Sequence, residues 1–124
     1  MTGILVNNSA IRFSGEIGMA SVWLVLCNVP DVETARSIAT KLVESRAAAC
    51  VSVGSRIQSI YRWQGAIEAA DEIQLTIKID SANYDMVETI IRTNHPYQLP
   101  EILAVPVARG LPAYLDWVCA ESNP

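Results

Sequence analysis

The connector between the second predicted helix and the last predicted strand contains two prolines and three side chains with binding or acid–base chemistry. It reads His95-Pro96-Tyr97-Gln98-Leu99-Pro100-Glu101, and its imidazole is the single histidine of the protein. Proline fixes the backbone φ angle, so the two prolines fix where an imidazole, a phenol and a carboxylate point. The spacing alone equally allows a proline-rich connector in which His95 stabilises the end of a helix.

Cys27 lies where a continuous apolar run gives way to a predicted helix, in Leu26-Cys27-Asn28-Val29-Pro30-Asp31. A thiol placed just before a helix N-terminus has a lowered pKa, which makes its thiolate available to a metal or an oxidant. The alternative is an inert cysteine buried at the end of a strand. The sequence leaves both interpretations open.

Aromatic side chains gather beside a turn in a third segment, which runs from Ile60 to Gly65 and contains Tyr61 and Trp63. Aromatic residues near a hairpin turn can line a pocket or stack on a ligand. They can equally pack at an interface between subunits, so this segment indicates a contact surface without naming its partner.

Composition narrows the classes of partner and compartment. The chain has 124 residues, a net charge of −4 and nine Lys and Arg. These basic residues are scattered, which disfavours nucleic acid as a partner. No apolar run reaches the roughly 20 residues of a membrane-spanning helix, and the first 18 residues do not resemble a secretory signal. The cysteines are odd in number and lack a Cys-x-x-Cys pair, which predicts reduced thiols in the cytoplasm: Cys27, Cys50 and Cys119.

Periodicity predicts the elements that position these segments. An apolar strand over 22–26 precedes a helix that Asp31 caps and that ends near 46–48. Strands over 50–53, 57–63 and 73–79 follow and form a long antiparallel hairpin. A second helix is capped by Ser81 and ended by Pro96, and a last strand over 102–107 precedes a short helix that starts at Leu111-Pro112.

The order β-α-β-β-α-β with a C-terminal helix predicts an α+β, ferredoxin-like fold with both long helices on one face of an antiparallel sheet. We expect one domain over residues 21–122, preceded by a flexible or loosely docked extension over 1–20. Nothing else in the sequence is long enough to cover the other face of the sheet. With hydrophobic residues at 51% of the chain, other subunits are the simplest cover.

Five segments, taken in order, resemble one known family. They read Cys-Asn-Val-Pro-Asp, Ala-Ala-Cys-Val, Ser-Ile-Tyr-Arg-Trp-Gln-Gly, His-Pro-Tyr-Gln-Leu-Pro-Glu-Ile and Pro-Ala-Tyr-Leu-Asp-Trp. This series is similar to the CutA family of divalent-cation tolerance proteins and covers about Ser21 to Ser122.

The resemblance implies a tight homotrimer in which strands of neighbouring subunits complete shared sheets, and a shape like that of the PII-type signalling trimers. It also implies a link to tolerance of divalent cations, with copper or another divalent cation as a weakly bound ligand. By this resemblance Cys27 and His95 occupy the positions of proposed copper ligands. Some members carry a further histidine where this chain has Asn94, and a carboxamide is a much poorer copper ligand than an imidazole. Another subunit, a carboxylate or water would have to complete the site.

Four functions follow as hypotheses. The first is a metal-binding trimer that is not an enzyme. The second is a signalling trimer that binds a small ligand in a pocket with Lys78 as an anion contact; its other members are Tyr61, Trp63, His95, Tyr97 and Glu101. The third is a structural trimer onto which other molecules dock. Catalysis is disfavoured, because the sequence offers no nucleophile paired with a base and no Gly-rich phosphate loop.

Overall fold

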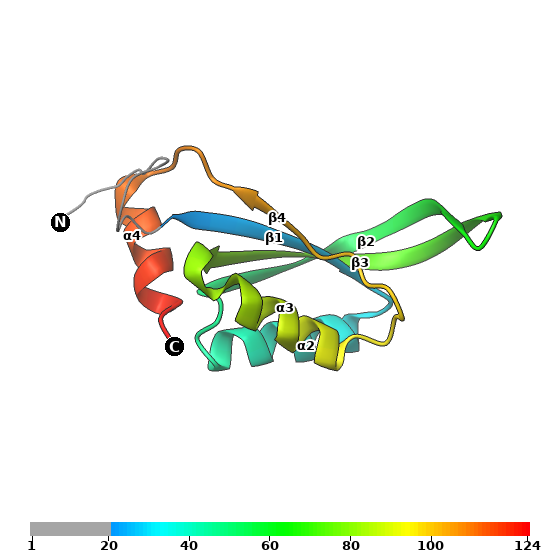
Figure 1. Cartoon of the computed structure of the whole chain (residues 1–124), viewed down its shortest axis with the longest axis horizontal. Helices are drawn as coiled ribbons and strands as arrows, with labels where there is room; N and C mark the ends of the chain where they lie inside the picture. The colour runs from blue at the N-terminus through cyan, green and yellow to red at the C-terminus, as the bar shows by residue number, and fades with distance from the viewer. Residues whose placement is uncertain (1–20) are drawn as a thin grey trace.

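The structure is a computed structural model that describes residues 21–124. The predicted N-terminal extension lies outside the described residues. The chain order is β1, α2, β2, β3, a 3-10 turn (η1), α3, β4 and α4 (Figure 1). Their bounds are Val22–Val29, Val32–Glu44, Cys50–Trp63, Ala66–Asp80, Ser81–Asn83, Tyr84–Asn94, Leu103–Pro106 and Pro112–Glu121.

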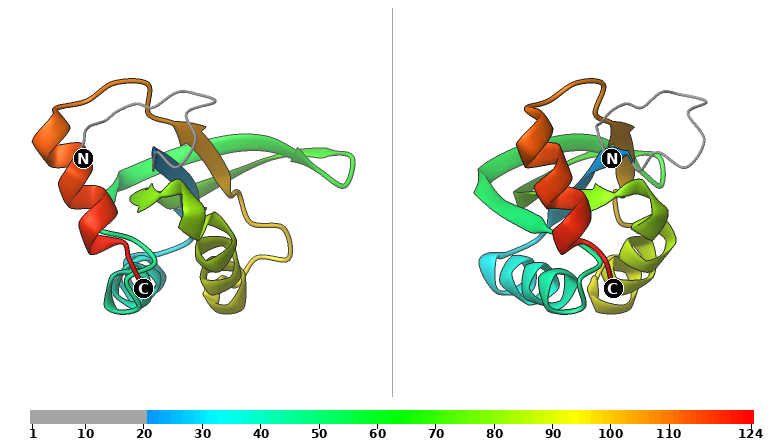
Figure 2. Two further views of the ribbon diagram at one scale, coloured as in Figure 1. Left: turned by 60° about the vertical axis from the view of Figure 1, so that its left-hand side comes forward. Right: turned by 90° about the vertical axis from the view of Figure 1, so that its left-hand side faces the viewer.

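One antiparallel sheet organises the molecule, with the strand order β2-β3-β1-β4. Helices α2 and α3 lie side by side on one face of it (Figure 2). The predicted ferredoxin-like order is therefore confirmed. The hairpin of β2 and β3 reaches well beyond the other strands, and α4 lies across the opposite end of the molecule (Figure 1).

The core forms between the sheet and the two helices, because β3 alternates apolar and polar residues while α2 has a continuous apolar face. Ile73, Leu75, Ile77 and Ile79 of β3 are buried, with at most 3% of their surface exposed. They pack with Ile38 and Leu42 of α2 and Val87 and Ile91 of α3. The core thus lies between the sheet and the two helices, and the connector after α3 leads from the helix layer back to the sheet.

Local signals placed the start of one helix and missed the start of the other. The Asp31 carboxylate accepts a hydrogen bond of 2.8 Å from the Thr34 amide at the start of α2, as predicted. Ser81 does not cap the next helix: Asp80 accepts from the Ala82 amide, and a 3-10 turn precedes α3. A short turn intervenes because the first available cap is the last residue of β3.

The two strands predicted over 50–53 and 57–63 are one continuous strand, β2, with a register shift between Val53 and Arg56. Gly54 explains the error, because a Cβ there would lie 2.9 Å from the Gln74 carbonyl oxygen. Glycine permits this close approach at a bulge, so here it bends the strand rather than ending it.

Within residues 21–124, the sheet face away from α2 and α3 is covered only at one end, by α4 (Figure 2). Apolar side chains remain exposed on the sheet and hairpin: Ile60 at 70%, Ile67 at 63%, Leu103 at 55% and Val105 at 48%. No helix within residues 21–124 combines the length and apolar character needed to cross a membrane.

Candidate functional site

The connector between α3 and β4 is fastened to the end of β1 by His95. Its Nε2–H donates to the Asn28 carbonyl oxygen at 2.8 Å, and its Nδ1 accepts from the Tyr97 amide at 3.1 Å. A carbonyl only accepts and an amide N–H only donates, so these two bonds select the neutral imidazole with its proton on Nε2. His95 is 8% exposed, so water has little access to either ring nitrogen in this tautomer.

A buried carboxylate on β3 binds the side chain of Tyr97, two residues after His95 in the connector. The Tyr97 hydroxyl donates to Glu72 Oε2 at 2.8 Å, and the Ser59 hydroxyl donates to Oε1 at 2.6 Å. Glu72 is 7% exposed. The Tyr97 ring also packs against His95, with 4.7 Å between ring centroids. One continuous network therefore joins β1, β2, β3 and the connector.

Asn28 contributes to the same network with its side chain as well as its carbonyl. Its Nδ2 donates to Glu101 Oε1 at 3.3 Å. Its Oδ1 is buried and has no hydrogen-bond partner among the described residues. A buried acceptor left unpaired is destabilising by about 1–3 kcal/mol. This end of the molecule therefore contains one buried acceptor that the described residues leave unpaired.

The electrostatics at this end oppose ionisation of the nearby acids. The pKa of the Cys27 thiol is raised to about 12, mainly by burial and in smaller part by the carboxylates of Glu101 and Glu72. Burial, and then the bond to Glu72, likewise raise the pKa of the Tyr97 phenol. Of the two interpretations that the sequence left open for Cys27, the structure therefore favours the buried cysteine at the end of a strand over the thiol of lowered pKa. The thiol points into the core rather than toward the N-terminus of α2, and desolvation of the thiolate outweighs any helix-dipole effect.

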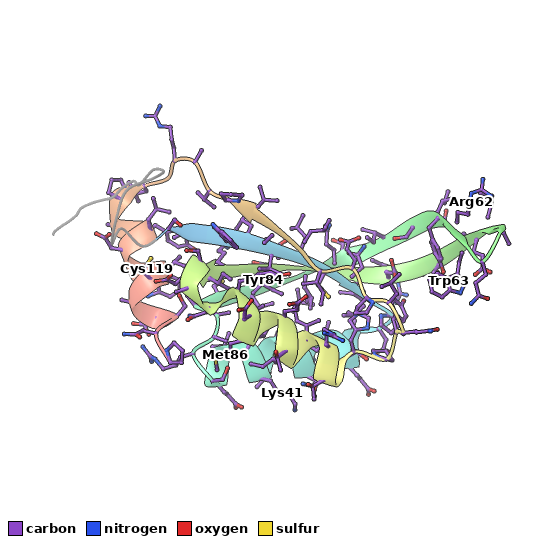
Figure 3. The ribbon with its side chains drawn as sticks, viewed as in Figure 1. Lys41, Arg62, Trp63, Tyr84, Met86 and Cys119 are labelled. Atoms are coloured by element: carbon purple, nitrogen blue, oxygen red, sulfur yellow. The ribbon has the colours of Figure 1, made fainter. Side chains whose placement is uncertain are left out.

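The residues predicted to form one pocket are spread along the sheet. Tyr97 and Glu101 do share the network with His95, and the electrostatic influence of Tyr61 on Tyr97 places it nearby. Trp63 is the last residue of β2 and lies at the far tip of the hairpin (Figure 3). Lys78 lies toward the other end of the sheet: its Nζ is 4.0 Å from Cys50 Sγ and 5.9 Å from the centre of the Tyr114 ring.

Three members of the network were not predicted: Asn28, Ser59 and Glu72. Each lies within a strand, and Glu72 belongs to the polar set of the β3 alternation, where a solvent-facing side chain is the ordinary expectation. The available signal was that Glu72 follows Asp71 in a strand whose neighbours are apolar. Only the return of the connector over the strand ends shows that Glu72 is buried.

Copper coordination can be compared with the donors that are present. The described residues contain no group of three or more His, Cys, Asp and Glu side chains placed to hold a metal ion. Cys27 is a buried thiol, and both ring nitrogens of His95 are engaged. Asn94 donates to the Ile90 carbonyl oxygen at 2.8 Å within its own helix. As they are arranged in one chain, Cys27 and His95 do not fit a copper ion.

The fold and this strand-end network define a small ferredoxin-like α+β protein. Residues 23–121 match the family model described as CutA1 divalent ion tolerance protein. The chain is also 43% identical, over 95 residues, to the divalent-cation tolerance protein CutA of Thermus thermophilus, a match that covers 77% of this chain and 92% of that protein. The chain belongs to the CutA family.

Two solved structures extend the comparison. A CutA from Archaeoglobus fulgidus, described as a periplasmic divalent cation tolerance protein, has a TM-score of 0.80 at 34% identity, covering 82% of this chain and 99% of that one. A protein from Nostoc sp. PCC 7120, described as a PII-like protein CutA in apo form, has a TM-score of 0.76 at 32% identity, covering 82% and 97%.

Proposed function

We propose that this chain is the subunit of a cytoplasmic homotrimer that binds divalent cations, copper among them, and contributes to tolerance of them. The family match over residues 23–121 carries the proposal. The family is described by tolerance of a divalent ion rather than by a reaction, so the proposed role requires no catalysis.

The uncovered apolar surface supports the trimer. Ile60 and Ile67 of the hairpin are 70% and 63% exposed. Burying apolar surface stabilises by about 25 cal/mol per Å², so subunit contacts are the natural use of such side chains. Light scattering after size exclusion is expected to give three times the chain mass of 13.5 kDa.

Substitutions on the hairpin test whether it is part of that contact. Ile60→Lys with Ile67→Lys is expected to shift the protein toward monomer. Met86→Lys is the control, because Met86 is also an exposed apolar residue, at 36%, but lies on α3 away from the hairpin. A double variant that stays trimeric shows that the hairpin is not an interface.

Calorimetry of the untagged, reduced trimer tests the cation role. Cu(II), Zn(II) and Mg(II) are each titrated, and at least one of them is expected to bind, because tolerance of a divalent ion is the property by which the family is described. Absence of heat and of retention in equilibrium dialysis for all three ions overturns the function. The Cys27→Ser, His95→Ala variant then asks a separate question, whether the ligands implied by family resemblance are the ones used.

The cysteines support the cytoplasmic location. Cys27 and Cys50 are free thiols, and thiols persist where glutathione and thioredoxin keep them reduced. The Archaeoglobus fulgidus relative is described as periplasmic, so the location needs its own measurement. Fractionation of cells that express the untagged full chain is expected to recover it with cytoplasmic markers, and recovery with periplasmic markers rejects this part of the proposal.

A second candidate, a signalling trimer that binds a small ligand, is favoured by the unpartnered Asn28 Oδ1 and by the PII-like description of the Nostoc relative. Because the carboxylate of Glu101 is bonded to the same Asn28 amide and Lys78 lies toward the other end of the sheet, the ligand would be a neutral or cationic hydrogen-bond donor rather than an anion. A thermal-shift screen of amines and amides against matched carboxylates tests this, and stabilisation by the carboxylates alone rejects it.

A further inference from the structure

We infer that His95 is a positioning residue, a neutral imidazole clasp that fixes the connector to β1, and that neither it nor Cys27 is a ligand of the cation. The clasp consists of the bond from His95 Nε2–H to the Asn28 carbonyl and the bond from the Tyr97 amide to His95 Nδ1. The inference goes beyond the proposed function, because it holds whether or not the trimer binds a metal.

The imidazole has no free lone pair for a metal. A metal binds a ring nitrogen that carries no proton and whose lone pair is available. Nε2 carries the proton that the Asn28 carbonyl accepts at 2.8 Å, and the lone pair of Nδ1 accepts the Tyr97 amide at 3.1 Å. Coordination through either nitrogen breaks one of these bonds and leaves a backbone group at a buried site without its partner, which is unfavourable.

The thiol lacks the access that a ligand needs. Cys27 has no exposed surface and belongs to the core cluster between the sheet and the helices. A metal ion could reach its sulfur only if the packing of that cluster opened. Cys27 therefore acts as a small apolar residue, the alternative that the sequence left open.

The clasp has a definite use in the network. By holding the amide of Tyr97, His95 sets the position from which the Tyr97 hydroxyl reaches Glu72 at 2.8 Å. By holding the carbonyl of Asn28, it fixes the residue whose side chain binds Glu101 and leaves Oδ1 without a partner. His95 acts on the site through these two neighbours and needs no contact with a ligand.

Nitrogen NMR of the untagged protein tests the inference directly, because the sequence contains a single histidine. We expect one ring nitrogen of the protonated type and one of the hydrogen-bonded, unprotonated type, coupled as in the Nε2–H tautomer. Zn(II), which is diamagnetic, is added at the concentration that saturates calorimetric binding. Unchanged ring resonances support the clasp, and a coordination shift of either ring nitrogen overturns it.

Two substitutions separate the two bonds of the clasp. His95→Asn keeps an acceptor for the Tyr97 amide, since asparagine readily accepts from the amide two residues on. His95→Gln keeps a donor near the Asn28 carbonyl and loses that acceptor. We expect hydrogen exchange of the Tyr97 amide to accelerate at least tenfold in His95→Gln and to change little in His95→Asn. Equal exchange in both variants and the wild type contradicts the clasp.

Metal affinity gives the matched control. Asn94→Ala removes a hydrogen bond one residue away and should leave both the tautomer and the Tyr97 exchange unchanged. Whatever affinity the wild type has for Zn(II), Cys27→Ser should retain it within about twofold. Any loss in the His95 variants should follow the loss of protection of the Tyr97 amide, so that His95→Asn keeps more affinity than His95→Gln. A tenfold loss in Cys27→Ser, or a loss in His95→Asn as large as that in His95→Gln, overturns the inference and leaves the cation role intact, whereas a wild type that binds no ion removes the cation role and leaves the clasp intact.

Discussion

The two ends of the sheet carry polar clusters of similar size, and they differ in whether one chain completes them. At the end formed by α4, Arg46 donates to the carbonyl oxygens of Asn123 and Ala120 at 3.0 and 3.1 Å and lies 3.5 Å from the Glu121 carboxylate. Asn83 donates to the carbonyl oxygens of Ser122 and Ala47. The carbonyls of Ala120, Ser122 and Asn123 are thereby paired, two of them with the Arg46 guanidinium.

The connector end is built from carboxylates and neutral donors. Glu72 accepts only hydroxyl groups, and Asn28 Oδ1 accepts nothing within the described chain. The comparison teaches that polar density does not by itself mark a site. The α4 end satisfies these polar groups within one chain, whereas the connector end keeps one buried acceptor, Asn28 Oδ1, that the described residues leave unpaired.

The largest expected effect concerns Cys27 at the connector end. In a Cys50→Ala, Cys119→Ala background, alkylation of Cys27 by iodoacetamide at pH 8 should be about a thousandfold slower than in the urea-unfolded chain. The reason is that the pKa rises from its ordinary 9.0 to about 12 in the folded protein, and the thiolate is the reactive form. The rate should rise about tenfold per pH unit between pH 8 and pH 11, because that range lies below the pKa of about 12. Folded and unfolded rates within tenfold of each other would mean that neither burial nor the neighbouring carboxylates suppress the Cys27 thiolate.

Asn83→Ala tests the claim that the α4 end is structural. The substitution removes the bonds to the Ser122 and Ala47 carbonyls. At about 1 kcal/mol per hydrogen bond, the free energy of unfolding should fall by about 2 kcal/mol. Urea denaturation at a fixed subunit concentration measures it, since an oligomer's stability depends on concentration. Cation binding should be unchanged, and a variant that loses it would show that the α4 end has a function of its own.

Tyr97→Phe tests the connector end by a smaller loss of stability. The variant keeps the ring against His95 and removes one donor from the Glu72 carboxylate. A bond to a charged group stabilises by about 1.5 kcal/mol or somewhat more, so a loss of about 1.5 kcal/mol is expected. Combining it with Glu72→Leu should cost less than the sum of the two single changes, because both partners are then apolar. Additive losses would show that the bond is not formed in solution.

Sequence reasoning reached the fold because each element carries a local signal. The apolar run of β1, the alternation of β3 and the Asp31 cap are read from residues a few positions apart, and Pro112 marks the start of α4. The errors fell where one residue permits two structures. Gly54 allows a bulge as readily as a strand end, and Ser81 competes with Asp80 for the same cap.

The candidate site was predicted only in part, because its members meet through tertiary contacts. His95, Tyr97 and Glu101 share one connector and were found together. Glu72 joins them only because the connector returns over the strand ends. Lys78 was placed in the same pocket on residue type, and the register opposite Cys50 and Leu24 puts it toward the α4 end. A direct signal for the Cys27 pKa was also missing, since burial by distant residues decides it.

The smallest expected effect is the pH dependence contributed by Asp31, a third carboxylate at the connector end. Its bonds to Thr34 lower its pKa below the ordinary 3.8, and its charge adds to the rise in the pKa of Tyr97. A depressed pKa in the folded state adds stability above the unfolded pKa, and this contribution disappears as the pH falls through the folded value. Asp31→Asn keeps a cap and removes the charge.

Urea denaturation of Asp31→Asn and the wild type should therefore show a small difference at pH 7 that shrinks as the pH falls below the ordinary pKa of 3.8. The same variant should lower the pH at which Tyr97 ionises, read from the tyrosinate absorbance against Tyr97→Phe. If Asp31→Asn changes the helix cap but leaves the Tyr97 titration untouched, the acidic character of the connector end comes from Glu72 and Glu101 alone. The electrostatic difference between the connector end and the α4 end, which contains the Arg46 guanidinium, then rests on those two carboxylates.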